Sequence, residues 1–140
     1  GVTVNFESAI VGDERGVTPE GRKIYTLGDV YPYADLVTYP SSIEGFGNAF
    51  LEAIYYRRPL VVNNYSIYEA DIKPKGFKVV EFNGFISEAT LEEARYVVSH
   101  PLENAEHAEQ NYELARRYYS FAMLARRLNL LLSDCFGDDV

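Results

Sequence analysis

Two short apolar runs separated by a helical pattern constrain the fold of this chain most. Residues 36–39 are typical of a buried strand, which Pro40 ends, and residues 60–62 form a second strand of apolar side chains only. Between them, residues 48–56 repeat apolar side chains at helical spacing, and Pro59 cannot continue that helix. A strand, a helix and a strand in this order predict a parallel pair joined by a right-handed crossover.

The rest of the chain extends this alternation. Residues 2–6 alternate apolar and polar side chains and predict a short strand, and residues 77–82 predict another buried strand. Residues 8–23 are interpreted as a loop, followed by a short helix within residues 24–34. The predicted fold class is α/β, a Rossmann-like parallel sheet with flanking helices. Because only three to four strands are visible, we expect residues 1–140 to be one partial domain of a longer protein.

The C-terminal third is predicted to be helical. Thr90 followed by Glu93 has the pattern of a capping box at the start of a helix, and Pro101 breaks that helix. A long helical tract follows at about residues 103–134, and Ser120 marks a kink or a new N-cap within it.

The charge balance narrows the possible partners. Thirteen Lys and Arg against 21 Asp and Glu give a net charge of −8, which repels nucleic acid and anionic membrane surfaces, so no nucleic acid partner is expected.

No apolar run approaches the roughly 18 residues that suggest a membrane span, and the N-terminus shows no signal pattern. We therefore expect a cytoplasmic protein.

The metal-binding residue types are not arranged as a metal site. Cys135 is the only cysteine, which excludes an intrachain disulfide and fits a reducing compartment, and we interpret it as a passive thiol. His100 and His107 are interpreted as surface histidines at a helix break. No Asp-x-Asp occurs, and the neighbouring pair Asp138 and Asp139 lies in the C-terminal tail. Neither a metal nor a cofactor is expected.

The segment that links the strand at residues 36–39 to the following helix carries the chemistry. In open α/β sheets, ligands bind at the carboxyl ends of strands, where loops lead into helices. Gly45 and Gly47 permit positive φ and a close approach of the backbone to a ligand. The free amides of Gly47, Asn48 and Ala49 then form an anion site at the helix N-terminus.

Two carboxylates flank this glycine loop. Glu52, a little over one turn into the helix, can accept two hydrogen bonds from a vicinal diol such as that of ribose. Glu44 lies before the turn and could reach a second hydroxyl-bearing group. The alternative is that acidic residues here only complement the helix macrodipole.

Glu44 and Glu52 are separated by seven residues, with Gly-Phe-Gly after the first and Leu-Glu-Ala around the second. This arrangement resembles the Glu-x7-Glu motif of glycosyltransferase family 4, whose members have the GT-B fold. The similarity covers nearly all of residues 1–134, in collinear order. Its other parts are Ala34-Asp35-Leu36, Tyr39-Pro40-Ser41, Arg58-Pro59-Leu60-Val61-Val62, Ile67-Tyr68-Glu69 and Tyr118-Tyr119-Ser120-Phe121.

The resemblance implies a role for each residue of the motif. Glu44 would be the catalytic residue, contacting hydroxyls of the donor sugar, and Glu52 would hold the ribose diol. The sugar and diphosphate would lie on the backbone of four residues, Gly45, Phe46, Gly47 and Asn48. The enzyme would transfer a hexose from a nucleoside diphosphate sugar to a hydroxyl acceptor with retention of configuration. No protein nucleophile is generally agreed for such enzymes.

The resemblance also implies partners that precede Gly1. The N-terminal domain, the upstream strands and an Arg and Lys pair for the diphosphate would lie there, so the isolated chain is expected to be inactive. Peripheral membrane association would come through the rest of the enzyme. Two departures from the family pattern are Tyr65-Ser66 in place of a Gly-Gly turn and Arg57 in place of a frequent Gly.

Other interpretations of the sequence stay open. A nucleotide-sugar epimerase of the same fold is one, and a non-catalytic nucleotide-binding or scaffolding module is another. Tyr112, Tyr118 and Tyr119 either form an exposed aromatic face for the missing domain or pack within this chain.

Overall fold

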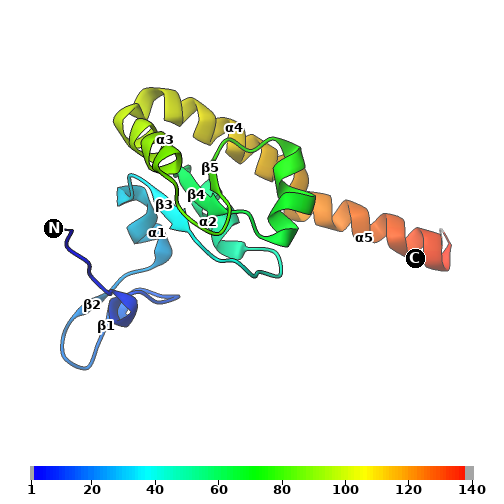
Figure 1. Ribbon diagram of the computed structural model, residues 1–140. Helices are drawn as coiled ribbons and strands as arrows, with labels where there is room; N and C mark the ends of the chain where they lie inside the picture. The colour runs from blue at the N-terminus through cyan, green and yellow to red at the C-terminus, as the bar shows by residue number, and fades with distance from the viewer. Residues whose placement is uncertain (1, 138–140) are drawn as a thin grey trace.

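The computed structural model of the protein describes residues 2–137, so that Asp138 and Asp139 lie outside the described residues (Figure 1). The strands are β1 Gly16–Val17, β2 Lys23–Ile24, β3 Val37–Tyr39, β4 Leu60–Asn63 and β5 Val80–Phe82. The helices are α1 Leu27–Val30, α2 Asn48–Tyr55, α3 Glu88–Ser99, α4 Pro101–Tyr119 and α5 Phe121–Phe136. Short helical turns lie at Ser8–Ile10, Tyr31–Tyr33, Tyr68–Ile72 and Lys73–Lys75.

A three-stranded parallel sheet in the order β3-β4-β5 forms the centre of the fold. Val37 pairs with Leu60, and Val61 pairs with Val80. The predicted strands at residues 36–39 and 60–62 and the helix between them are confirmed, as is the α/β, Rossmann-like class.

Helices cover both faces of this sheet, so that the central strand β4 is buried on both sides. Leu60 and Val62 pack in one cluster with Phe50 and Ile54 of α2. The intervening Val61 belongs to a second cluster, formed with Val80 and Phe82 and packed against Ala94 and Val97 of α3. The alternation of side chains along a strand thus places α2 and α3 on opposite faces.

Strand β5 is shorter than the sequence predicts, because it begins at Val80 rather than at Phe77. The backbone N–H of Lys78 donates to Asn111 Oδ1 at 2.7 Å, and its carbonyl accepts from Asn111 Nδ2 at 2.8 Å. Asn111 on α4 is 2% exposed. The Asn111 side-chain amide therefore pairs with the backbone of Lys78 in the way that a neighbouring strand would.

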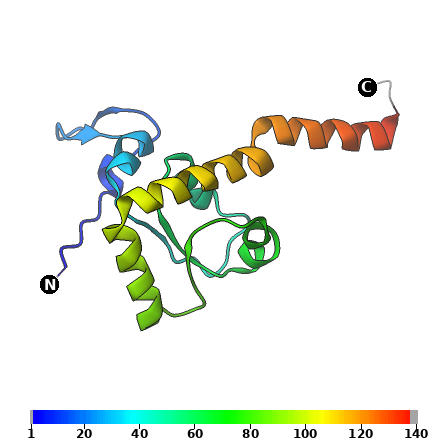
Figure 2. The same ribbon diagram turned by 90° about the horizontal axis from the view of Figure 1, so that it is seen from above.

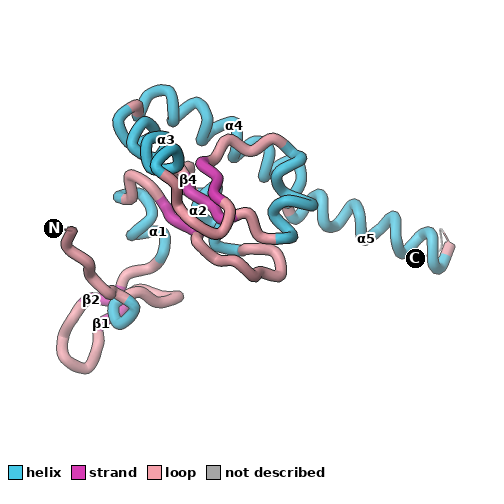
Figure 3. The backbone as a smooth tube through the Cα atoms, viewed as in Figure 1, coloured by secondary structure: helices cyan, strands magenta, loops and turns pink. Residues whose placement is uncertain are grey.

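The strand predicted at residues 2–6 is wrong. Val2 and Phe6 are both 91% exposed, and no backbone hydrogen bond joins this segment to another strand of the described residues. Alternation alone does not make a strand when no neighbour offers its backbone groups. The predicted loop at residues 8–23 contains the small antiparallel ribbon of β1 and β2 (Figure 3).

The helix boundaries differ from the predicted ones in three further details. The N-cap of α3 is Ser87, whose Oγ accepts from Thr90 N at 3.2 Å, so Thr90 lies inside the first turn and does not cap it. The long tract begins at Pro101 rather than at residue 103, because proline fits the first turn of α4. Of the two possibilities predicted for Ser120, a kink or a new N-cap, the structure has the N-cap, with Oγ accepting from Met123 N at 3.3 Å, and α5 ends at Phe136 rather than at about residue 134.

Helix α5 extends away from the rest of the chain in both perpendicular views (Figures 1 and 2). None of its residues is buried. No helix among the described residues is long and apolar enough to cross a membrane.

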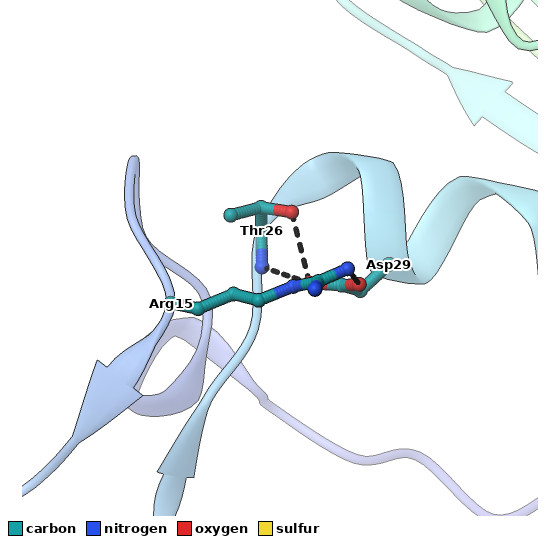
Figure 4. Close-up of polar contacts among 3 residues, drawn as sticks. All are labelled: Arg15, Thr26 and Asp29. Carbon is teal, nitrogen blue, oxygen red and sulfur yellow. Dashed lines mark hydrogen bonds and ion pairs between the residues drawn. The ribbon is translucent and has the colours of Figure 1, made fainter.

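The short helix α1 begins in a polar cluster (Figure 4). Asp29 accepts from the backbone N–H and the hydroxyl of Thr26, both at 2.9 Å, and forms an ion pair with Arg15. The Arg15 guanidinium, followed by the two Thr26 donors, holds the pKa of Asp29 well below its usual value. This cluster ties the N-terminal ribbon to the segment that enters the sheet.

Candidate functional site

The loop after β3 brings the predicted site residues to the carboxyl edge of the sheet. Residues 40–47 run from the end of β3 to the start of α2. Glu44, Gly45, Phe46 and Gly47 lie in this loop, and Asn48 is the first residue of α2. This is the edge at which open α/β sheets bind ligands.

Gly47 has a conformation that only glycine adopts without strain. It is the N-cap of α2, with φ +100°. A Cβ at this position would overlap the Tyr65 hydroxyl and would lie 3.3 Å from Tyr39 Cε1. The turn into α2 therefore requires a residue without a side chain at position 47.

The first amides of α2 are left open by this turn. Phe50 N donates to the Gly47 carbonyl at 3.0 Å. The amides of Gly47, Asn48 and Ala49 have no hydrogen-bond partner in the part of the chain that the structure describes. Unpaired N–H groups at a helix N-terminus attract an anion.

Glu44 carries a negative charge at neutral pH. Hydrogen bonding with the Tyr39 hydroxyl, and then with Ser41, lowers the pKa of its carboxyl group. The pKa of Tyr39 is raised, first by burial and then by Glu44. A carboxylate placed in this way can accept hydrogen bonds from ligand hydroxyls.

Glu52 contacts a different part of the chain. The Tyr31 hydroxyl donates to Glu52 Oε2 at 3.3 Å, and the Tyr31 ring stacks on Tyr56 with centroids 4.9 Å apart. Burial, followed by the charge of Glu52, raises the pKa of Tyr31 to about 12. Because this hydrogen bond is long, a better donor can displace it.

Asn63 is a residue of this edge that was not predicted from the sequence. It ends β4, is 4% exposed, and donates from Nδ2 to the carbonyls of Ser41 at 3.3 Å and Pro40 at 3.5 Å. Its Oδ1 accepts from Gly84 N at 2.9 Å. One amide thus joins the loops that follow all three strands. The signal in the sequence was a polar residue directly after a wholly apolar strand.

Tyr65, one of the two residues in place of the Gly-Gly turn, is 1% exposed. Its hydroxyl donates to the Phe46 carbonyl at 2.8 Å, and its ring lies edge-on to Tyr39 with centroids 6.0 Å apart. The side chain therefore packs beneath the glycine loop. No feature of the sequence indicated this contact.

Arg57, the other departure from the family pattern, keeps the left-handed conformation for which glycine is favoured, with φ 54°. Its guanidinium lies 3.8 Å from the centroid of Tyr112, and its Nε lies 2.5 Å from Glu109 Oε2. These contacts hold the end of α2 against α4. Tyr119 packs edge-on against Phe46, with centroids 5.0 Å apart. Tyr112 and Tyr119 thus pack within the chain.

The histidines and the cysteine take no part in this edge. His100 stacks on Tyr96, with centroids 3.8 Å apart, and Cys135 is exposed. Within residues 2–137, no group of three or more His, Cys, Asp or Glu side chains is placed to hold a metal ion.

Two curated proteins are similar to this chain. A mannosylglucosylglycerate synthase of Petrotoga mobilis is 45% identical over 80 residues, which are 57% of this chain and 18% of that protein. A mannosylglucosylglycerate synthase of Thermotoga maritima is 35% identical over 108 residues, which are 68% of this chain and 25% of that protein. The chain thus spans a quarter or less of the length of these relatives.

No family model and no solved structure matches the chain.

Proposed function

We propose that this chain is the donor-binding part of a retaining glycosyltransferase of the GT-B fold and family 4 type. The complete enzyme transfers a hexose from a nucleoside diphosphate sugar to a hydroxyl acceptor. The observation that carries the proposal is the loop from Glu44 to Asn48, where a left-handed glycine opens the N-terminus of α2 at the carboxyl edge of a parallel sheet. The similarity to two mannosylglucosylglycerate synthases supports it.

The open amides of α2 bind the diphosphate. When the bond from the sugar to the diphosphate breaks, negative charge grows on the leaving phosphate, and the positive end of the helix stabilises that charge. These donors are already oriented by Gly47, so little reorganisation accompanies the reaction.

The two carboxylates position the remaining parts of the donor. Glu44, ionised at neutral pH, accepts hydrogen bonds from the hydroxyls of the donor sugar. Glu52 exchanges its long hydrogen bond from Tyr31 for two bonds from the ribose diol. The hexose is then held against the loop in position for the acceptor.

The relatives suggest which donor to test first. Because both are named for a product that contains mannosyl and glucosyl groups, the transferred hexose is mannose or glucose in this proposal. The matching probes are GDP, UDP and ADP with their mannose or glucose conjugates.

Glu52→Gln is expected to weaken binding of the best of these nucleoside diphosphates about tenfold or more. The amide keeps the size of the side chain but donates where the carboxylate accepted, and it loses a charge-assisted hydrogen bond. Isothermal titration calorimetry on the chain measures the effect. Glu92→Gln on the exposed face of α3 is the matched control, and its dissociation constant should equal that of the wild type.

Equal affinity of Glu52→Gln and wild type would remove the ribose contact from the proposal. Binding without transfer by a longer protein that includes the N-terminal domain would favour the non-catalytic module instead.

A further inference from the structure

Tyr65 is a buried residue whose hydroxyl contacts the backbone of the candidate site from the side of the core. Tyr65 is 1% exposed, and the one hydrogen bond that its hydroxyl makes within the described residues goes to the Phe46 carbonyl at 2.8 Å. Its ring is held between Tyr39, with centroids 6.0 Å apart, and Tyr68, with centroids 5.8 Å apart. The hydroxyl is therefore fixed in position by packing before any ligand binds.

This hydrogen bond sets the direction of an amide that the proposed function uses. The Phe46 carbonyl and the Gly47 N–H belong to the same peptide unit, which is planar and trans, so that the two groups point in opposite directions. Since Tyr65 draws the carbonyl toward the core, the N–H of Gly47 points away from the core. The same hydroxyl occupies the space that a Cβ of residue 47 would need.

We infer that Tyr65 is a positioning residue that holds the Phe46–Gly47 peptide with its N–H directed at the diphosphate. The inference rests on the proposed function, and it assigns to Tyr65 the orientation of one of the three open amides. A chain with Gly-Gly at this place has no side chain that could hold the loop from below. In this protein, the loop is shaped by a buried phenol.

The test is Tyr65→Phe, which removes only the hydroxyl and leaves the ring packing. The Phe46 carbonyl loses its donor, the peptide can rotate, and the anion site becomes less well oriented. We expect the affinity for GDP, UDP or ADP, whichever the wild type binds best, to fall about tenfold. The amide resonance of Gly47 should shift in ¹H–¹⁵N spectra without ligand.

Tyr68→Phe is the matched control. Tyr68 is also fully buried, and its hydroxyl donates to Glu81 Oε1 at 2.7 Å, so the substitution removes a similar hydrogen bond from the same region. A similar loss of thermal stability is expected for both variants. Only Tyr65→Phe should weaken binding, because Tyr68 makes no hydrogen bond to the glycine loop.

The outcomes separate the inference from the proposed function. If the wild type binds a nucleoside diphosphate and Tyr65→Phe binds it equally well, the inference is wrong and the function stands. If both variants weaken binding equally, the role of Tyr65 is only structural and the inference is wrong. If the wild type binds none of the three nucleotides, the proposed function fails and the inference fails with it.

Discussion

Gly47→Ala is expected to lower the free energy of unfolding by about 3 kcal/mol and to abolish nucleoside diphosphate binding. Residue 47 has φ +100°, which costs an L side chain about 1 to 2 kcal/mol. The added Cβ would also overlap the Tyr65 hydroxyl, which is buried and cannot move without breaking its bond to Phe46. Relief of the overlap must rotate the loop and so misalign the open amides of α2.

Chemical denaturation measures the loss of stability, and calorimetry with the best nucleotide measures the loss of binding. Gly45→Ala is the matched control, because a Cβ at Gly45 meets no atom within 4 Å and its φ is not in the left-handed range. Its stability should lie within about 0.5 kcal/mol of the wild type. If Gly47→Ala were as stable as Gly45→Ala, the described shape of the loop would be wrong.

Asn63→Ala is expected to destabilise the protein by about 2 to 3 kcal/mol. The substitution removes one amide that serves three backbone groups, the carbonyls of Pro40 and Ser41 and the N–H of Gly84. Asn63 itself is 4% exposed, so the substitution removes three hydrogen bonds made by a buried side chain. The loops after β3 and β5 should then separate, and the first of them carries Glu44.

Denaturant unfolding checks this loss, and hydrogen exchange at Gly84 reports on the broken contact directly. The neighbouring Asn64 provides the control, since its Oδ1 is buried without a partner in the described residues. Asn64→Ala should cost less than about 1 kcal/mol. Equal losses for the two variants would show that Asn63 does not join the loops.

The sequence was sufficient to predict the central part of the fold. Residues 36–62 form a strand, a helix and a strand because two short apolar runs flank a segment in which apolar side chains recur at helical spacing. Pro40 follows the first strand directly, whereas α2 ends at Tyr55, before Pro59. The prediction of strands failed where contacts with another segment of the chain determine whether a strand forms. Residues 2–6 alternate correctly but no strand pairs with them, and the residues before Val80 bond to the Asn111 side chain instead of a strand.

The sequence predicts the loop of the candidate site, but not the buried side chains that bond to this loop. Gly45 and Gly47 both permit positive φ between a strand and a helix, and the structure has positive φ at Gly47 but not at Gly45. The contacts of Asn63 and Tyr65 join residues that are about 20 apart in the chain, and no local pattern reports such contacts. The roles of Glu44 and Glu52 stay predictions.

In the proposed function, nucleoside diphosphates bind at the N-terminus of α2. The most direct measurement is a ¹H–¹⁵N titration of the chain with GDP, UDP and ADP and their hexose conjugates. We expect one nucleotide to shift the amide resonances of Gly47, Asn48 and Ala49 most. Spectra that do not change with any nucleotide, or that change only on the surface of α4 between Glu106 and Arg117, would contradict this expectation.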